Sequence, residues 1–292
     1  MENLIAVNAP NLQKKPTTRR VMIDILIALL PATVAAVVLF GLKALLVIAT
    51  CVAASVLSEF IFNLLCKKKQ TVGDLSAVVT GLLLALCLST NVTVWQCIVG
   101  SVFAIVIVKC AFGGLGYNFA NPSVTAKVML IIAFSLGLSN VSDGTIPSII
   151  DMLLGKRDGA IGETCAVALV VGGIYLLARK VISWEIPVAY IGSVFALSFA
   201  LTGDVNQALY HTLGGGLLLG AIFMATDPVT SPKKCVGKLI FGLGCGLLTV
   251  MIRFYGTNAE GVPFAILIMN IINPYLNMIG AKKVVGGAEN EG

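Results

Sequence analysis

The chain has 292 residues, of which 58% are hydrophobic and only 12% are charged, and its formal net charge is +6. Soluble globular domains carry about twice that charged fraction, so the composition excludes a soluble protein. The apolar residues come in runs of about 15–23, and about 20 of them cross a bilayer. We therefore expect an all-α polytopic membrane protein in a lipid bilayer, with no nucleic acid among its partners.

The apolar runs predict ten transmembrane helices. Residues 1–20 are polar and run 21–40 is long enough to span, which favours an N-terminal tail over a cleavable signal. We expect a membrane domain over 21–282 and a C-terminal tail over 283–292. The expected spans lie near 21–40, 43–65, 75–90, 93–111, 122–138, 163–181, 185–202, 212–226, 237–255 and 262–280. The third and eighth are short and glycine-rich, which is typical of segments that line a site.

The Lys and Arg residues predict the orientation of the chain. With the N-terminus inside, sixteen lie on cytoplasmic loops or adjacent membrane edges, Lys109 and Lys127 among them, and four lie on the other side. This is a strong positive-inside bias. We therefore expect a plasma-membrane protein with both tails in the cytoplasm and the polar loop 139–162 on the outer face.

Two similar stretches indicate an internal repeat. Residues 81–85, Gly-Leu-Leu-Leu-Ala, resemble residues 216–220, Gly-Leu-Leu-Leu-Gly, and each belongs to the third span of a set of five. An odd number of spans per half forces the halves into opposite orientations. We expect two inverted five-helix repeats.

The loop 112–123 is the first candidate site. Gly113, Gly114 and Gly116 allow a sharp turn or close approach of the backbone to a ligand, and Asn118 and Asn121 offer amide groups. A proline follows Asn121 and suits the first turn of a helix. The loop is either a tight connection before a helix or part of a nucleotide or flavin pocket.

Two further polar stretches stand at the ends of spans. Thr226 and Asp227 lie in Ala-Thr-Asp-Pro, where the proline stops a helix, and an Asp at membrane depth is a functional candidate. Glu163 and Thr164 open the sixth expected span, where Glu163 either caps the helix or helps to hold an anion or a cofactor. His211 is the only histidine and no cysteines form a Cys-x-x-Cys pair, so we expect no metal site built by this chain alone.

These stretches resemble one family in their order along the chain. The resemblance covers about residues 10–282 and is carried by Asp24-Ile-Leu-Ile-Ala-Leu-Leu-Pro-Ala32, Phe112-Gly-Gly-Leu-Gly, Asn121-Pro122, Gly162-Glu-Thr and Phe223-Met-Ala-Thr-Asp-Pro-Val-Thr-Ser-Pro. The chain is similar to RnfD, the D-type membrane component of the Rnf electron-transport complex. That family is related to the B-type component of the sodium-pumping NADH:quinone oxidoreductase.

The resemblance implies FMN joined by a phosphoester bond to a threonine of an extracytoplasmic loop. A flavin transferase makes this bond at an Asp-x-x-Ser/Thr-Gly/Ala-Ala-Thr pattern. The corresponding stretch here is residues 139–145, in which Ser142 and Thr145 match and three other positions depart from the pattern. Thr145 is the expected attachment site. Ser142, Ser148 or no covalent flavin are the alternatives.

The family resemblance also implies a second, non-covalent riboflavin nearer the cytoplasmic face. The loop 112–123 and the stretch 225–232 are the natural parts of its pocket. The implied function is a redox relay in an ion-translocating ferredoxin:NAD+ oxidoreductase of a bacterium or archaeon, which requires the other Rnf subunits. No residue is expected to be catalytic, since the flavins supply the chemistry.

Two other functions stay open. One is a subunit of a sodium-pumping NADH:quinone oxidoreductase, and the other is a small-solute transporter or channel built on an inverted repeat. Transport of Na+ or H+ would need polar groups at membrane depth. The candidates by residue type are Asp24, Glu59, Thr80, Ser101, Lys109, Asp227 and Asn270.

Overall fold

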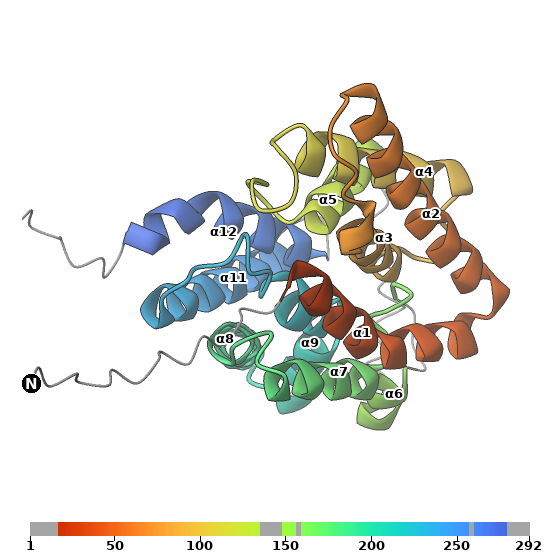
Figure 1. Ribbon diagram of the computed structural model, residues 1–292. Coiled ribbons are helices and arrows are strands. Elements are labelled where there is room, and N and C mark those ends of the chain that lie inside the picture. The colour runs from red at the N-terminus through yellow and green to blue at the C-terminus, as the bar shows by residue number, and fades with distance from the viewer. Residues whose placement is uncertain (1–16, 135–147, 156–158, 257–259, 279–292) are drawn as a thin grey trace, which may run out of the picture.

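The computed structural model describes residues 17–134, 148–155, 159–256 and 260–278, and every regular element in these ranges is a helix (Figure 1). Five helices are long and apolar enough to cross a membrane: α1 (Thr18–Phe40), α2 (Leu42–Leu65), α8 (Glu185–Thr202), α11 (Cys235–Tyr255) and α12 (Gly261–Met278). The all-α fold expected from the composition is thus confirmed for the described residues.

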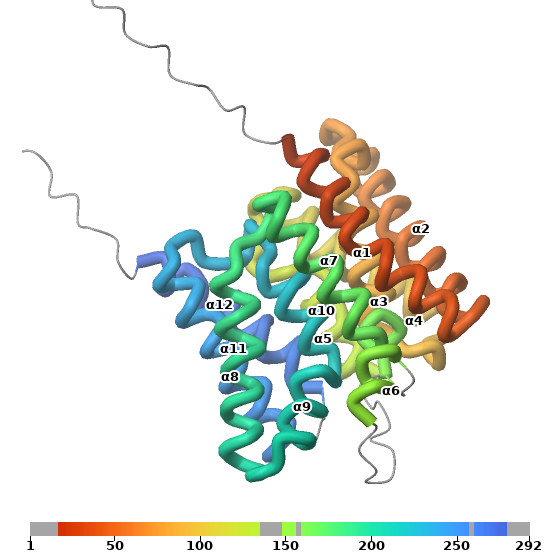
Figure 2. The backbone as a smooth tube through the Cα atoms, turned by 90° about the horizontal axis from the view of Figure 1, so that it is seen from below, coloured from red at the N-terminus to blue at the C-terminus, as the bar shows by residue number. Residues whose placement is uncertain are grey.

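Four shorter apolar elements complete the bundle. They are α3 (Ser76–Cys87), α4 (Val94–Val102) with the π-helix η2 (Phe103–Cys110), α5 (Pro122–Phe134) and α7 (Ala166–Ala178). α2 packs on α3 and α4, α8 packs on α11, and α1 and α5 pack on α7 and α12 respectively (Figure 2). Large apolar side chains such as Leu42, Leu65 and Val38 are exposed on the outside, as a lipid-facing surface requires.

The eighth expected span, 212–226, is broken instead of continuous. The helix α9 (Val205–Leu213) ends before Gly214, and α10 (Leu217–Leu219) with the π-helix η3 (Gly220–Met224) forms a separate half-span. Gly215 and Gly216 separate the two segments, with left-handed φ values of 57° and 72°. Only glycine adopts this conformation without strain, so the glycines that marked the span as unusual also break it.

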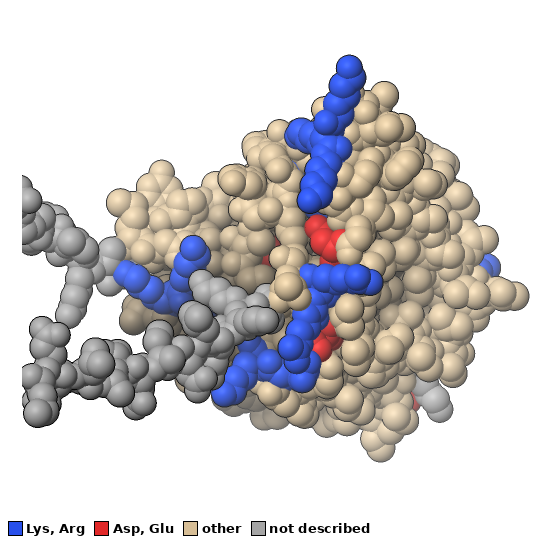
Figure 3. All heavy atoms as spheres, in the orientation of Figure 1, with Lys and Arg blue, Asp and Glu red and all other residues tan. Residues whose placement is uncertain are grey.

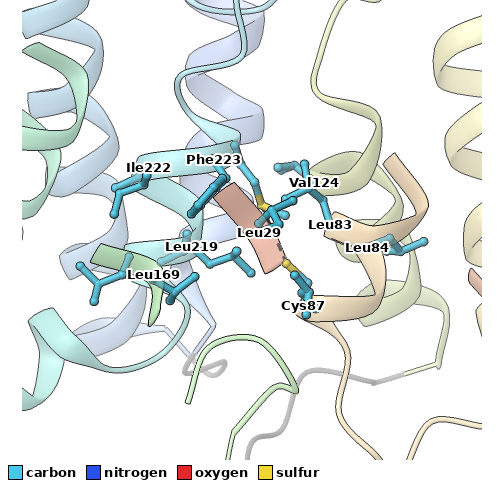
Figure 4. Packing of buried hydrophobic residues seen from close by; sticks show 14 of the residues in the cluster. Leu29, Leu83, Leu84, Cys87, Val124, Leu169, Leu219, Ile222 and Phe223 are labelled. Atoms are coloured by element: carbon cyan, nitrogen blue, oxygen red, sulfur yellow. Dashed lines mark hydrogen bonds between the residues drawn. The ribbon is translucent and has the colours of Figure 1, made fainter. Parts of the chain in front are cut away.

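The half-span η3 and the short helix α3 meet in the centre of the core. Leu83 and Cys87 from α3 and Phe223 from η3 point toward Leu29 of α1 (Figure 4). The Sγ atom of Cys87 lies 3.8 Å from the Sδ atom of Met224, which joins the two short elements directly. Both elements are covered by the long helices, so their ends lie inside the protein and not in lipid.

The sixth span begins later than the sequence predicts. α7 starts at Ala166, so Glu163 and Thr164 lie in a turn before it and not in its first turn. That turn is tied to the end of α3, because the N–H groups of Ile161 and Gly162 donate to the carbonyls of Leu88 and Leu86, both at 2.8 Å. Packing on α3 therefore delays the helix.

Two short elements lie outside the bundle core. η1 (Val72–Asp74) precedes α3, and α6 (Ile149–Leu154) lies within the expected outer loop. Ser148 caps α6, since its Oγ accepts a hydrogen bond from the Asp151 N–H at 3.2 Å. Thr145 and Ser142, the residues expected to concern covalent FMN, lie outside the described residues.

Candidate cofactor site

A cavity that is partly open to its surroundings lies between α1, α3, α5, α7 and the loops beside them. Its walls are mainly apolar, with Val79 and Leu83 of α3, Leu115 of the glycine loop and Phe223 of η3 among them. The polar residues that line it are Ser76, Thr80, Lys109, Asn118, Asn121, Ser123, Thr226 and Asp227.

Four residues singled out in the sequence meet at this cavity. Asn118 and Asn121 come from the loop 112–123, and Thr226 and Asp227 follow η3, about a hundred residues later. The two stretches were expected to form one pocket, and the structure brings both to the same walls. Convergence of distant polar groups on an apolar hollow is the usual sign of a ligand site.

Of the two roles expected for the three glycines of the loop, the structure shows the sharp turn. Gly113, Gly114 and Gly116 have φ values of 117°, 99° and 99°, which glycine alone adopts without strain. They do not line the cavity, while Leu115 between them does. The glycines therefore turn the loop so that Leu115 and Asn118 reach the wall.

Asn121 holds two elements together at the cavity. Its Oδ1 accepts the Ser123 N–H at 3.0 Å, which caps the start of α5, and its Nδ2 donates to the Met224 carbonyl at 3.2 Å. With its amide oriented to satisfy its neighbours, Asn270 of α12 accepts from the Asn121 N–H and donates to the Thr230 carbonyl, both at 3.1 Å. Asn121 thus links α5, η3 and α12 through hydrogen bonds and also lines the cavity.

Asn118 is also engaged within the wall. Its Oδ1 accepts the Gly116 N–H at 3.3 Å and its Nδ2 donates to the Ala120 carbonyl at 3.2 Å. Ser123 donates to the Thr80 carbonyl at 2.9 Å, so the loop is fastened to α3 as well. The Asn118 amide, which the sequence analysis considers as a group for binding a ligand, therefore makes hydrogen bonds within the wall of the cavity.

Asp227 stabilises the turn that follows η3. Its carboxylate accepts the Val229 N–H at 3.1 Å and the Thr230 hydroxyl at 3.3 Å. Burial raises the pKa of the Asp227 carboxyl above its usual value, while these two hydrogen bonds oppose the shift. Thr226 is buried beside it and donates to the Ile222 carbonyl. The turn sets one polar edge of the cavity.

A buried ion pair supports the opposite edge. Lys109 Nζ lies 2.8 Å from Glu59 Oε1 and 2.6 Å from Ser76 Oγ, and the two ionic side chains are 2% and 1% exposed. Thr71 donates to the same Glu59 oxygen. Lys109 sits on the π-helix η2, an irregularity common at functional sites. Lys109, one of the sixteen basic residues that the sequence places at cytoplasmic loops or membrane edges, is thus buried and paired.

A second buried pair was not foreseen. Lys127 of α5 lies 2.8 Å from Glu260, which precedes α12, and donates to the Cys87 carbonyl at the end of α3, 2.6 Å away. Lys127, another of those sixteen basic residues, is likewise buried and paired. A lysine inside the apolar run of α5 was the available signal.

Glu163 and Thr164, the other predicted site residues, do not line the cavity. Thr164 is buried, and the Glu163 carboxylate lies against the backbone of Gly216, where an added Cβ would collide with it. They therefore belong to the junction between the end of α3 and the break before α10. This junction is separate from the walls formed by Asn121 and Asp227.

The remaining polar candidates have structural partners. Asp24 of α1 binds Arg179 at 3.2 Å and accepts from the Tyr175 hydroxyl at 3.0 Å, which ties α1 to the end of α7. Thr80 donates to the Ser76 carbonyl, and Ser101 donates to the Cys51 carbonyl. Figure 3 shows Lys and Arg side chains gathered on one face, over the start of α1, the end of α2 and the α7–α8 turn.

These features define an all-helical membrane protein with a cavity of apolar and polar lining between short central helices. The chain belongs to the NQR2, RnfD, RnfE family, whose model matches residues 5–286. This confirms the resemblance found in the sequence.

Similar proteins carry names from one complex. The chain is 39% identical to the D component of the Na(+)-translocating ferredoxin:NAD(+) oxidoreductase complex of Acetobacterium woodii, over 97% of this chain and 96% of that protein. It is 35% identical to the proton-translocating counterpart of Clostridium ljungdahlii, over 94% of each chain. The D component of the ion-translocating oxidoreductase complex of Methanosarcina acetivorans is 33% identical over 97% of each chain.

Proposed function

We propose that the chain is the flavin-carrying membrane subunit of an ion-translocating ferredoxin:NAD+ oxidoreductase complex. Its family membership and the names of relatives that match it over almost their whole length support this function. The activity belongs to the assembled complex, so the chain acts with the other Rnf subunits. The relatives' names give sodium in one case and protons in another, so the family does not select the ion.

The cavity is the proposed site of a non-covalent riboflavin, and its composition is the observation that carries the proposal. Apolar walls from Leu83 and Phe223 suit a flat ring system, and polar groups at Ser76, Thr80 and Asp227 suit its edges and its hydroxylated chain. These residues would hold and orient the group and exclude water around it.

A flavin bound there would supply electron transfer, which the protein side chains cannot. The chain's own contribution is position. Asn121 and Asn118 fix the glycine loop and the turn after η3, so the walls are formed before a ligand enters. A preformed site loses less entropy on binding than a flexible one.

Covalent FMN on Thr145, added by a flavin transferase, is the second part of the proposal. The family resemblance and the outer position expected for loop 139–162 support it. Of the alternatives, Ser148 is the less suited, because its hydroxyl donates to Asp151 Oδ2 at 2.7 Å while it caps α6. Ser142 remains the alternative acceptor.

We also propose that the ten expected spans form two inverted halves in a bacterial or archaeal plasma membrane, with both tails in the cytoplasm. The packing of α2 on α4 parallels that of α8 on α11, and α3 and η3 hold equivalent places as short third elements. Pairing of α1 with α7 and of α5 with α12 is what a two-fold axis between the halves requires.

The intact mass of the protein expressed with its flavin transferase tests the covalent flavin, with a Thr145→Ala variant for comparison. We expect the wild type to gain one FMN less water and the variant to lack it. A variant that keeps the added mass would move the attachment to another hydroxyl, with Ser142→Ala the next comparison. No added mass and no extractable riboflavin in either protein would favour a small-solute channel instead.

A further inference from the structure

A basic pocket opens beside the turn that joins α7 to α8. It is an open pocket of about 550 Å³ between that turn and the start of α11, and Lys180, Lys233 and Lys238 line it. Lys238 donates to the Ser183 hydroxyl at 2.6 Å and lies 3.9 Å from Glu185. No described acidic side chain lies within ion-pair distance of Lys180 or Lys233, so the pocket keeps a positive charge.

An apolar groove continues from this pocket along the bundle. The groove has a volume of about 380 Å³ between Ile174 of α7 and Val188 of α8, with Ile222 of η3 among its other lining residues. Leu177 and Ile182 line both the groove and the basic pocket, so the two spaces adjoin. α7 and α8 follow one another in the chain, and both pack on η3. The groove is the space left between the two helices.

Glycine keeps part of this groove open. Gly192 lies on α8 at the groove, and a Cβ placed on it would meet no heavy atom within 4 Å. Trp184 is exposed at the basic end, and tryptophan is enriched at the level of lipid headgroups. The space therefore has a charged end near the water interface and an apolar end within the membrane.

We propose that this composite site binds one anionic phospholipid. The phosphate lies against Lys180, Lys233 and Lys238, and one acyl chain lies in the groove between α7 and α8. Basic pockets between membrane helices on the cytoplasmic side bind such headgroups. A soluble phosphate would use the lysines alone and leave the groove unexplained, which is why a lipid is the occupant that the combination favours.

The lipid would also support the wall of the central cavity. Val181, Ile182 and Thr226 line both that cavity and the basic pocket. A headgroup held by the lysines therefore lies one layer of side chains from the proposed flavin. The lipid site rests on its own residues and does not depend on the flavin proposal.

The test uses the purified full chain in nanodiscs of phosphatidylcholine with or without phosphatidylglycerol, and native mass spectrometry of the lipids it retains. We expect the wild type to retain phosphatidylglycerol preferentially. A Lys180→Gln/Lys233→Gln variant should lose roughly 10- to 30-fold of that preference, as two lysines near a lipid surface contribute. Lys43→Gln, an exposed lysine at the start of α2, is the matched control and should change nothing.

A Gly192→Leu variant tests the groove separately. Its side chain would fill the open space, so retention of both lipids should fall while an unchanged melting temperature shows that the fold is intact. Glycerol 1-phosphate tests a soluble ligand and should not displace the lipid. Equal retention by wild type and the double lysine variant would overturn the proposal. So would full competition by glycerol 1-phosphate together with no effect of Gly192→Leu, which would assign the pocket to a soluble phosphate.

Discussion

Asn121 and Met224 are 103 residues apart in the sequence and are joined by a hydrogen bond of 3.2 Å from the Asn121 amide to the Met224 carbonyl. The oxygen of the same side chain caps α5 through the Ser123 N–H. One side chain therefore connects the glycine-loop half of the cavity to the η3 half. The shape of the cavity depends on this joint, because neither stretch forms a wall by itself.

Asn121→Ala is predicted to lose non-covalent flavin while covalent flavin is retained. The change removes a helix cap and leaves the Met224 carbonyl without its partner, a loss of about 1–3 kcal/mol in stability. Riboflavin released by acid from the purified protein should fall at least several-fold relative to the FMN fixed to the chain. Asn91→Ala, in an exposed position, is the control. Unchanged riboflavin in a folded Asn121→Ala protein would contradict the assignment of this cavity.

The sequence predicted the features of the fold that depend on a local motif. Apolar runs located the helices, and glycines and prolines located the loop 112–123 and the turn after η3. These features are local, since glycine, proline and apolar length act through their own stretch of backbone. The same local rule explains why α3 was recognised as short. That Asn118, Asn121, Thr226 and Asp227 of these two stretches line one cavity was implied by the family resemblance and not by a local pattern.

Features that depend on tertiary contacts were not predictable in this way. The pairing of Lys127 with Glu260 spans 133 residues, and no local pattern announces it. Glu163 was expected in the first turn of the sixth span, where a carboxylate suits the positive helix end, whereas contacts with α3 hold it in a turn before the helix. The π-helices η2 and η3 likewise cannot be recognised from the amino-acid composition of their segments.

Buried and partly exposed ion pairs should respond very differently to mutation. Lys109→Met leaves Glu59 charged and unpaired at 1% exposure, and such a change costs about 3–5 kcal/mol. Arg179→Gln breaks a pair in which the arginine side chain is 42% exposed and the Asp24 side chain is 10% exposed. Asp24 keeps the hydrogen bond from the Tyr175 hydroxyl, so the loss should be smaller than for Lys109→Met. Thermal unfolding in detergent should rank the two variants in that order.

A double variant separates lost pairing from lost packing at the same site. Lys109→Met combined with Glu59→Leu removes both charges and should recover most of the stability that Lys109→Met loses. If the double variant is as unstable as the sum of its single changes, the pair has no coupling energy. The buried ion pair would then be incidental to the fold.

One methyl group added at the contact between α1 and α7 should strongly lower the stability of the protein. A Cβ on Gly172 would collide with the Ala28 carbonyl oxygen, which belongs to backbone and cannot move aside by a rotamer change. Gly172→Ala should therefore destabilise the protein by about 1–3 kcal/mol. Gly192→Ala has free space around its new methyl group and should be neutral or stabilising, since alanine favours helix. Similar melting temperatures for the two variants would contradict this helix contact.

Asp227 predicts a pH dependence with a definite sign. Burial raises the pKa of its carboxyl from 3.8, so the folded protein holds the proton more tightly than the unfolded chain. At low pH both states are protonated and Asp227→Asn should match the wild type. As the pH rises above about 4, the unfolded wild type releases its proton first, and the wild type loses stability relative to the variant. The variant keeps an oxygen that accepts the Val229 N–H, so the turn should persist.

Melting temperatures of wild type and Asp227→Asn between pH 4 and pH 8 measure this difference, and Asp151→Asn in the cap of α6 is the control. The gap should widen in favour of Asp227→Asn as the pH rises and then stay constant once the folded carboxyl is ionised. A gap that widens in favour of the wild type would mean that the ionised carboxylate is stabilised in the folded protein, as a bound cation or a basic group of another Rnf protein would do. The same titration in the assembled complex tells these two causes apart. A basic group of another Rnf protein would reverse the sign of the difference in melting temperature only on assembly.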